Sequence, residues 1–283
     1  MASLQQIEKQ IESIEGLQDI IHSMRSLAAT YLSRAEERLD GVRAYADTVG
    51  HAIEDCLAGR DIRLHERDAL GDAVLVFFSE QGLCGRFNEV MAEAASERAK
   101  DLDLPRFIAV GKRGPALLRR QTLEIQAEMS GTTSPDGIDN AIHTIARTVV
   151  ALHEKGAIAK LYLLYARYLS PGRIAPQFER VLPLDLSQWR EKRKVLAAPP
   201  EVGLSRIALL SGLVDEYAFV SLYRAMTESL ASENGMRLQS MEAARSNIDE
   251  SIEDLRQQAR IQRQNEITEE LLDVVSGAEA LGA

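Results

Sequence analysis

The first 56 residues carry an apolar stripe that only a long helix with a partner along its length can bury. Apolar side chains recur at alternating steps of three and four residues, which places them on one narrow line of an α-helix. Sustained over about seven heptads, the pattern is typical of a coiled-coil seam and not of a broad core-facing helix. The predicted seam residues are Leu4, Ile7, Ile11, Ile14, Leu17, Ile21, Met24, Ala28, Tyr31, Ala35, Leu39, Val42, Ala46, Val49, Ile53 and Cys56.

A second seam follows Pro199 and Pro200, where helix-forming sequence runs from about 205 to 281 without proline. At 1.5 Å per residue this helix would be about 110 Å long. Because neither narrow seam can bury itself against a domain, we expect the two helices to run antiparallel and pair seam to seam. The second seam slips once near 262–267, and its predicted residues are Met241, Ala244, Ile248, Ile252, Leu255, Ala259, Gln262, Ile267, Leu271, Val274, Ala278 and Leu281.

The ends of the first helix are predicted from its flanking residues. Ser3 suits an N-cap, and Gly59 suits a stop, because serine accepts a bond from the first turn and glycine adopts the left-handed conformation that ends helices. This organisation predicts an N-terminal coiled-coil helix over 1–58, an α/β domain over 70–190 and a C-terminal coiled-coil helix over 204–283.

The middle of the chain has the composition of a compact domain. All eight prolines lie between positions 105 and 200, and nine of the fourteen aromatic residues lie in 71–190. Strand and helix signals alternate there, which indicates a mainly parallel sheet with helices on its faces. The predicted strands are 73–79, 107–110, 124–129, 159–168 and 177–184, the last two forming a hairpin, and the predicted helices are 87–101, 115–121 and 138–155.

Charge and composition exclude several classes of protein. The formal net charge is −10, whereas nucleic-acid binding requires clustered positive charge. No run approaches the roughly 20 apolar residues of a transmembrane helix, and residues 1–14 resemble neither a secretory signal nor a transit peptide. We therefore expect a soluble protein of a cytosol-like compartment. There Cys56 and Cys84 are expected as two thiols, one on a helix and one in a loop, rather than as a disulfide.

No motif predicts catalysis, a metal site or a cofactor. The segment 79–88 joins a predicted strand to a predicted helix, where phosphate loops occur, but it lacks the third glycine of GxGxxG and the Lys-Ser/Thr of GxxxxGK[ST]. Gly82 and Gly85 are instead expected to permit a tight turn and close packing. The five histidines are scattered and show no HExxH spacing.

One face of the C-terminal helix carries a pattern of charge. Arg256, Arg260 and Arg263 are spaced i, i+4 and i+7, so they share a face of the helix. The residues alone leave two interpretations open, a solvated face and a site for a protein partner.

Three segments resemble the gamma subunit of the F-type ATP synthase. They are the N-terminal helix 11–37, the loop Gly82-Leu83-Cys84-Gly85 with Phe87 and Asn88, and the C-terminal segment 231–281, notably Arg263-Gln264, 267–270 and 275–278. These segments span both ends and the middle in the family's order, so the resemblance covers essentially the whole chain.

The resemblance implies a rotor with no cofactor and no chemistry of its own. In this family an antiparallel coiled coil stands inside a ring of alpha and beta subunits, a Rossmann-like domain is inserted between its helices, and the foot meets the epsilon subunit and a membrane c ring. Arg263, Gln264 and Thr268 match residues that contact a beta-subunit loop. An acidic beta-subunit lever would add contacts with Arg256 and Arg260, because complementary charge orients an interface.

Departures from the family pattern suggest a divergent bacterial branch. Glu80-Gln81 replaces the usual Asp-Arg, Arg86 replaces a glycine, Ser26 replaces a common methionine, and Tyr31 replaces the usual Ser-Lys step. The expected location is the cytoplasmic face of the bacterial inner membrane.

Two further interpretations remain. A small-molecule-binding α/β protein with coiled-coil dimerisation arms would need a ligand pocket at the Gly82–Gly85 turn. A freestanding coiled-coil scaffold would self-associate without other partners.

Overall fold

Two long helices flank an α/β segment in the chain. The structure, a computed structural model, describes residues 3–57, 71–184, 203 and 205–281. Its elements in order are α1 (Leu4–Leu57), β1 (Asp72–Phe77), α2 (Phe87–Ala99), β2 (Arg106–Val110), α3 (Gly114–Arg120), β3 (Ile125–Met129), the short 3₁₀ helix η1 (Pro135–Gly137), α4 (Ile138–Glu154), β4 (Lys160–Ser170), β5 (Arg173–Leu182) and α6 (Arg206–Leu281). Contacts divide the chain into a larger unit, Ala28–Gln239, and a smaller unit formed by Met1–Leu27 and Ser240–Ala283.

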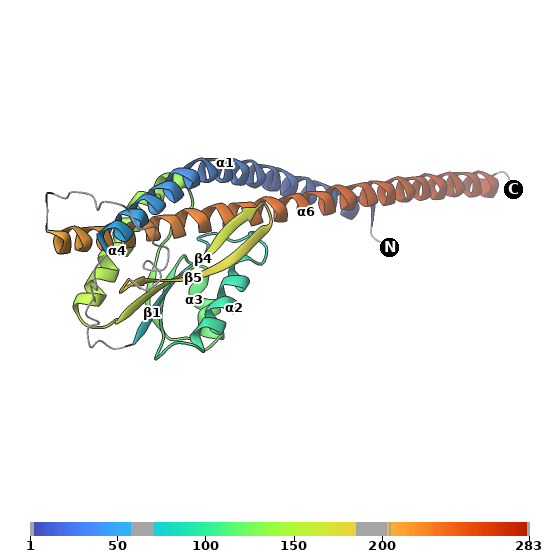
Figure 1. The fold of residues 1–283 in the computed structure, drawn as a ribbon. Coiled ribbons are helices and arrows are strands. Elements are labelled where there is room, and N and C mark those ends of the chain that lie inside the picture. The colour runs from blue at the N-terminus through green and yellow to red at the C-terminus, as the bar shows by residue number, and fades with distance from the viewer. Residues whose placement is uncertain (1–2, 58–70, 185–202, 204, 282–283) are drawn as a thin grey trace. The chain divides into compact units, whose positions relative to one another are not determined.

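The larger unit contains a five-stranded sheet of order β3-β2-β1-β4-β5 (Figure 1). The first four strands are parallel, and β5 runs antiparallel to β4. The arrangement places β1 in the centre, with Val74 opposite Phe107 on one side and Tyr162 on the other. It confirms the predicted mainly parallel sheet, and the order 3-2-1-4 is that of a Rossmann-like fold.

Helices cover both faces of this sheet. Successive side chains of β1 point to opposite faces of the sheet. Every residue of the strand is buried, because helices cover both faces. Leu75 and Phe77 pack in a core with residues of α4 and α6, such as Ile142 and Met226. The alternate residues of β1 pack in a second core with α2 and α3. Helix α6 is therefore a structural layer of the α/β domain as well as one of the two long helices.

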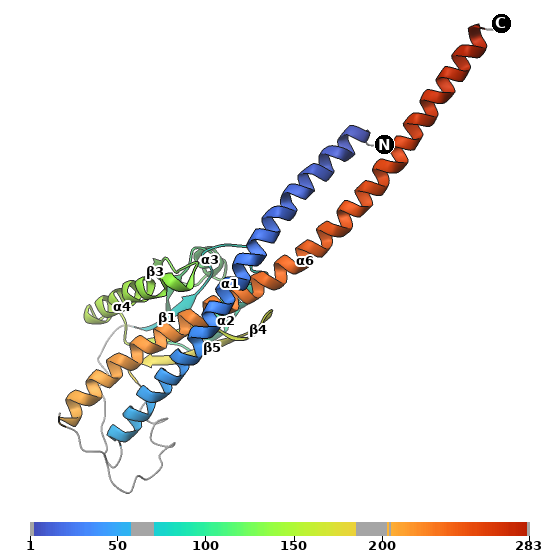
Figure 2. The same cartoon turned by 90° about the horizontal axis from the view of Figure 1, so that it is seen from above.

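Within the larger unit, α1 packs alongside α6 in the opposite direction (Figure 2). Leu39 forms a cluster with Ala231, and farther along Ile53 clusters with Leu210. Seven of the predicted seam positions are buried here: Ala28, Ala35, Leu39, Ala46, Val49, Ile53 and Cys56. Leu32, which the seam pattern missed, is also buried, because α1 meets Tyr168 of β4 as well as α6.

The smaller unit is an antiparallel pair of helices, as predicted. Cross-helix contacts pair early residues of α1 with late residues of α6 in regular succession. They are Glu8 with Arg263 (2.8 Å), Glu15 with Arg256 (2.9 Å), Gln18 with Asp249 (2.7 Å) and Arg25 with Glu242 (2.6 Å). Between them the predicted seam residues Ile7, Met241 and Ile252 are buried.

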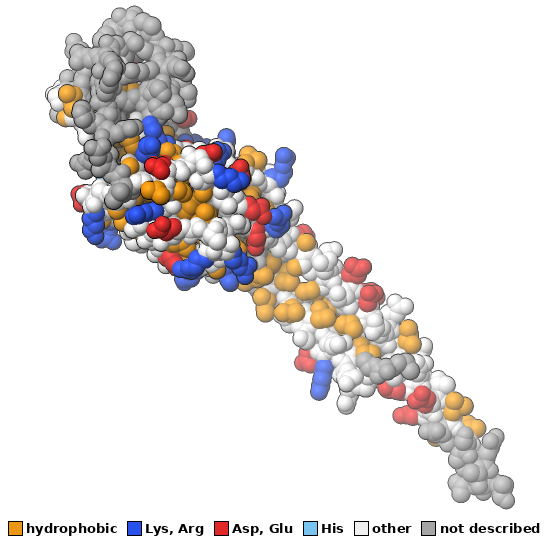
Figure 3. Space-filling model, turned by 90° about the horizontal axis from the view of Figure 1, so that it is seen from below, with side chains coloured by type: hydrophobic (Ala, Val, Ile, Leu, Met, Phe, Trp, Pro, Cys, Tyr) orange, Lys and Arg blue, Asp and Glu red, His pale blue; other side chains and the backbone are white. Residues whose placement is uncertain are grey.

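The predicted seams are wrong at four described positions. Leu17 is 50% exposed, because at that turn Gln18 faces α6. Ile267, Leu271 and Val274 are also exposed. The Glu8–Arg263 register places the beginning of α1 opposite about residue 267, so the later turns of α6 have no α1 beside them. Hydrophobic side chains are visible on the surface of the helices (Figure 3). The side chains of Ala278 and Leu281 lie outside the described part.

The beginning of α1 confirms the predicted cap. The Gln6 amide donates to Ser3 Oγ (3.4 Å), and the Ser3 amide donates to Gln6 Oε1 (3.0 Å), which is a reciprocal capping box. The predicted stop at Gly59 lies outside the described residues.

The predicted boundaries in the middle differ from the observed ones by a few residues, most at β5. This strand begins at Arg173, four residues before its predicted start, and includes Pro176 opposite Ala166. Proline usually interrupts a strand, but β5 lies at the edge of the sheet, where no neighbour needs the missing amide hydrogen.

The helix pairing is testable with one substitution at a buried position and one at an exposed position of the predicted seam. Ile252 is 5% exposed and Leu271 is 61% exposed on the same helix. We expect Ile252→Asp to destabilise the helix pair by about 2–4 kcal/mol, since it removes buried apolar surface and buries a carboxylate. Circular dichroism during thermal unfolding should show an earlier loss of helix. Leu271→Asp is the control and should change little; equal effects of the two substitutions would contradict the pairing.

Candidate functional site

The predicted structural loop lies between β1 and α2 and is closed by two polar side chains. Asn88, in the first turn of α2, accepts a bond from the Ser79 amide (3.0 Å) and donates to Ser79 Oγ (2.8 Å). Ser79 Oγ also donates to the Gln81 carbonyl oxygen (2.7 Å). Both side chains are buried, so the loop is tied to the end of β1 and to the beginning of α2.

The backbone of the loop turns sharply at two residues. Gly85 has φ of 57°, which confirms the predicted tight turn, and Leu83 has φ of 62°. A non-glycine residue in the left-handed region is uncommon and costs free energy. The Leu83 side chain is nevertheless 54% exposed. The close packing predicted for Gly82 and Gly85 is not found, since a β-carbon would lie 3.4 Å from Arg113 at the first and 3.5 Å from Met236 at the second. It is found instead at Gly114, where a β-carbon would overlap the Phe78 ring.

A groove of about 500 Å³ adjoins the loop at the carboxyl ends of β1 and β2. Residues of the loop, the first turn of α2 and α3 line it, and its basic side chains are Lys112, Arg113 and Arg120. Lys112 also lies 3.5 Å from Glu80. The groove is where the small-molecule interpretation requires a pocket, and its charge favours an anionic group.

Cys84, which also lines the groove, is a poor candidate nucleophile. Burial raises the pKa of its thiol. The hydrogen bond with Ser79 and the charge of Arg237 lower that pKa, and the charge of Glu233 raises it, so that the net shift is upward. The thiolate is the nucleophilic form of cysteine. Cys56 is buried as well, and the two cysteines form no disulfide.

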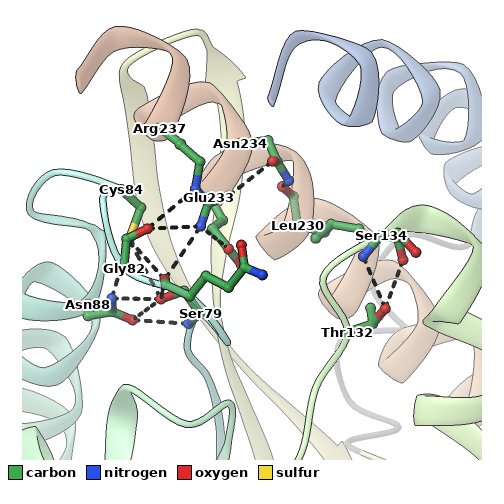
Figure 4. Close-up of polar contacts among 11 residues, drawn as sticks. Ser79, Gly82, Cys84, Asn88, Thr132, Ser134, Leu230, Glu233, Asn234 and Arg237 are labelled. Carbon is green, nitrogen blue, oxygen red and sulfur yellow. Dashed lines mark hydrogen bonds and ion pairs between the residues drawn. The ribbon is translucent and has the colours of Figure 1, made fainter. Parts of the chain in front are cut away.

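Behind the loop, α6 contributes a buried ion pair (Figure 4). Arg237 Nη2 lies 2.5 Å from Glu233 Oε1, and the two side chains are 8% and 6% exposed. The same guanidinium donates to Asn234 Oδ1 (3.1 Å), to the Gly82 carbonyl oxygen (3.3 Å) and to the Gln81 carbonyl oxygen (3.4 Å). One side chain of α6 therefore contacts the backbone of two consecutive loop residues.

The surroundings of Glu233 oppose its ionisation. Burial raises its pKa, the charge and hydrogen bond of Arg237 lower it, and the charge of Glu80 raises it again, to about 7. Glu80 itself is held by the Gly131 amide and Lys112. A carboxyl group with this pKa changes its charge near neutral pH.

A second buried glutamate on α6 connects α1 to the sheet. Glu228 Oε1 accepts from Arg43 of α1 (2.7 Å), and its Oε2 accepts from the Tyr168 amide of β4 (2.8 Å). One turn earlier, Arg224 Nη2 donates to both carboxylate oxygens of Glu179 of β5, at 2.7 and 2.8 Å. These charged residues of α6 thus bond to α1, β4 and β5.

Sequence reasoning did not single out the buried polar residues of α6. Charged residues normally indicate a solvated surface. A buried pair of charged residues therefore cannot be told from a surface pair by residue type alone. The available signal is the spacing of Glu233 and Arg237 at i and i+4 within a segment bounded by apolar residues such as Leu230 and Ala231.

The predicted partner-binding residues belong to the smaller unit, and the loop belongs to the larger unit. Arg263 and Arg256 are exposed and paired with Glu8 and Glu15 of α1, and Arg260 lies 3.8 Å from Glu253 on its own helix. The predicted arginine face therefore already has carboxylate neighbours inside the chain.

The other two predicted contact residues are exposed near the end of the helix pairing. Gln264 and Thr268 both lie at the surface, and Thr268 Oγ1 donates to the Gln264 carbonyl oxygen (2.8 Å). The Gln264 side chain is thus available at the surface, whereas the threonine hydroxyl bonds to its own helix.

Among the residues that the structure describes, no three histidine, cysteine, aspartate or glutamate side chains gather closely enough to hold a metal ion. Within the same ranges, no helix is both long and apolar enough to cross a membrane.

The sequence matches a family model over nearly its whole length. The model is described as ATP synthase and covers residues 3–281. A protein of Geotalea uraniireducens named ATP synthase gamma chain is 30% identical over 99% of both chains, and one of Syntrophobacter fumaroxidans is 29% identical over 99% of both. The chain belongs to the ATP synthase gamma-chain family. The fold agrees: the rotor of the Euglena gracilis mitochondrial ATP synthase contains a chain with a TM-score of 0.64 at 12% identity, covering 93% of this chain and 98% of that one.

The raised pKa of Glu233 predicts a pH-dependent stability. The pKa of Glu233 in the folded chain lies above 4.5, the ordinary value of a glutamate. The stability that its protonated form contributes is therefore fully present below pH 4.5 and is lost as pH rises through about 7. Glu233→Gln keeps the group neutral and should flatten the dependence of unfolding free energy on pH between about pH 5 and pH 8. Denaturant titrations at several pH values measure this.

The exposed Glu253, on the same helix, provides the control. Glu253→Gln removes one carboxylate from an exposed position, so it controls for the loss of a negative charge as such. An unchanged slope in Glu233→Gln would show that the buried carboxyl does not titrate in this range.

Proposed function

We propose that this gamma-chain family member is the rotating central stalk of an F-type ATP synthase. It would transmit torque between a membrane c ring and the alpha and beta subunits of a catalytic head, coupling ion transport to ATP synthesis or hydrolysis. The observation that carries the proposal is the family match over residues 3–281, which includes both long helices and the sheet between them.

The assemblies of the structural relatives support the proposed partners. The Euglena chain belongs to a rotor, and a Tetrahymena thermophila mitochondrial chain with a TM-score of 0.57 belongs to a central stalk with a c ring. We expect contacts with the alpha and beta subunits, the epsilon subunit and the c ring. The chain would lie at the cytoplasmic face of a bacterial inner membrane as a peripheral part of the complex.

The paired helices suit torque transmission. Two antiparallel helices bonded across their contact resist bending and twisting more than one helix does. In the smaller unit these bonds recur from Glu8–Arg263 to Arg25–Glu242. In the larger unit, α1 is bonded to α6 through Arg43 and Glu228, while α6 packs directly on the sheet.

Arg263, Gln264 and Thr268 are proposed to contact a loop of the beta subunit, with Arg256 and Arg260 facing its acidic lever. The pairs that Arg263 and Arg256 make with α1 are solvent-exposed, and such pairs contribute about 0–1 kcal/mol each. Both guanidinium groups can therefore turn to an acidic partner at little cost in stability.

We also propose that the chain has no ATPase activity of its own and that the chemistry takes place on the beta subunit. The loop 79–88 lacks the Lys-Ser/Thr of a GxxxxGK[ST] phosphate loop, which supports this.

Affinity purification of the tagged chain from its native membranes tests the proposal. Alpha and beta subunits with ATP hydrolysis in the eluate are the expected result, and co-purification of the c subunit would extend it to the membrane ring. Recovery of the chain alone, under conditions that keep other ATP synthases intact, would overturn the rotor function.

A paired substitution tests the contact residues. Arg263→Ala with Gln264→Ala should lower the ATPase activity recovered with the complex by about tenfold, since a charged contact to the head is lost, while the chain keeps its helicity. Arg245→Ala is the control, because Arg245 is also exposed and paired within the smaller unit, with Asp249 on its own helix. Full assembly and activity in the double variant would refute the assigned contact.

The groove beside the loop gives the small-molecule interpretation one supporting observation. Calorimetric titration of the isolated chain with ATP and ADP distinguishes the two functions. Saturable binding that Arg113→Ala and Arg120→Ala abolish would favour a ligand-binding protein, and the rotor proposal expects no such binding.

A further inference from the structure

We propose that Arg237 and Glu233 are positioning residues that fasten the loop 81–85 to α6, so that this loop moves with the long helix. The fastening itself is a property of this chain alone. Its use in coupling rests on the proposed rotor function.

The geometry of Arg237 supports a fastening role. Its guanidinium reaches from α6 to the carbonyl oxygen of Gly82 (Figure 4) and to that of Gln81. Two carbonyl groups of consecutive residues, held by one planar cation, fix the direction of the loop as well as its distance from the helix. The side chain is 8% exposed, so water competes little for these bonds.

Neighbours on α6 in turn fix the orientation of Arg237. Glu233 contacts Nη2 from one turn earlier, and Asn234 accepts from Nη1. The Asn234 amide group is itself anchored, because Nδ2 donates to the Leu230 carbonyl oxygen at 2.8 Å. A buried ion pair contributes little net stability compared with apolar residues of the same size. Its presence here is explained by the orientation that it gives to Arg237.

The loop has a structural need for this contact. Leu83 occupies the left-handed region with an exposed apolar side chain, and such a conformation persists only where surrounding bonds enforce it. Ser79 and Asn88 hold one side of the loop to β1 and α2. Arg237 holds the side that faces α6, so the loop is restrained from both sides.

Met236 of α6 adds an apolar contact beside Gly85 and Cys84. Among the described residues, however, Arg237 makes the only hydrogen bonds from α6 to residues 81–85. The remaining bonds of this segment run within it or to β1 and α2, and Glu80 bonds to Gly131 and Lys112. Removing the guanidinium should therefore release the loop from the helix without releasing it from the sheet.

Amide hydrogen exchange of the full chain tests the positioning role. In Arg237→Met, which keeps an apolar stem of similar length, exchange of the Phe87 amide, which donates to the Cys84 carbonyl oxygen of the loop, should accelerate by about tenfold or more, while exchange in β1 stays unchanged. Arg224→Met is the control, since it removes another arginine of α6, 20% exposed, whose bonds go to Glu179 of β5 and not to the loop. Unchanged protection of the Phe87 amide in a folded Arg237→Met chain would overturn the proposal.

In Arg237→Met the buried Glu233 loses its partner, which could prevent folding. A double variant keeps the test decisive in that case. Glu233→Leu with Arg237→Met removes both charges, and such replacements of buried pairs preserve folding. It should show the same faster exchange of the Phe87 amide, and normal protection there would again refute the role. Arg237→Lys should protect the loop more than Arg237→Met does, because its ammonium group can still donate to a carbonyl oxygen. The protection should remain incomplete, since an ammonium group does not reproduce the planar geometry with which the guanidinium holds both carbonyls.

The assembled complex gives a readout that stability alone would not move. With the Glu233→Leu, Arg237→Met chain, the complex should hydrolyse ATP but pump fewer ions per ATP than the unmodified complex. An equal number of ions pumped per ATP in the two complexes would show that the fastening of the loop has no role in coupling. If even the unmodified chain recovers no alpha and beta subunits, the rotor function fails, while the exchange experiment still decides the positioning role.

Discussion

A narrow apolar seam that no helix can bury alone is the constraint on which the rest of the structure depends. In the larger unit α1 gains its partner in α6, through contacts such as Leu39 with Ala231. Helix α6 also packs on the sheet there, because Leu222 and Met226 belong to the core on one face of the sheet. One helix therefore serves two partners, and the sheet, α1 and the loop after β1 all take their positions from it.

This double role explains why the buried surface of α6 is unusually polar. Glu228, Glu233 and Arg237 are all buried, yet each is bonded to a different element or to its own helix neighbour. Apolar contacts alone would allow α6 to slide or rotate against the sheet, because the hydrophobic effect has no direction. Hydrogen-bonded charges permit one register only, since any other leaves them buried without partners.

The sequence predicted those features that repeat and missed those that depend on a single neighbour. The two seams, the capping box at Ser3 and the parallel strands follow from periodicity and local chemistry. The exposure of Ile267 could not be predicted, because an apolar stripe does not say where the partner helix begins. Pro176 concealed the start of β5, and the Glu233–Arg237 pair was hidden because charged residues indicate a surface unless the fold is known.

The carboxylate neighbours of Arg256 and Arg263 have a consequence for a rotating shaft. Each guanidinium that turned towards the proposed acidic partner would leave Glu15 or Glu8 and return to it afterwards, so the number of charge pairs would stay constant throughout. Such an exchange has a shallow energy profile, because exposed pairs differ little in free energy. A shaft built in this way would meet successive acidic surfaces with low friction and would not be trapped at any one of them.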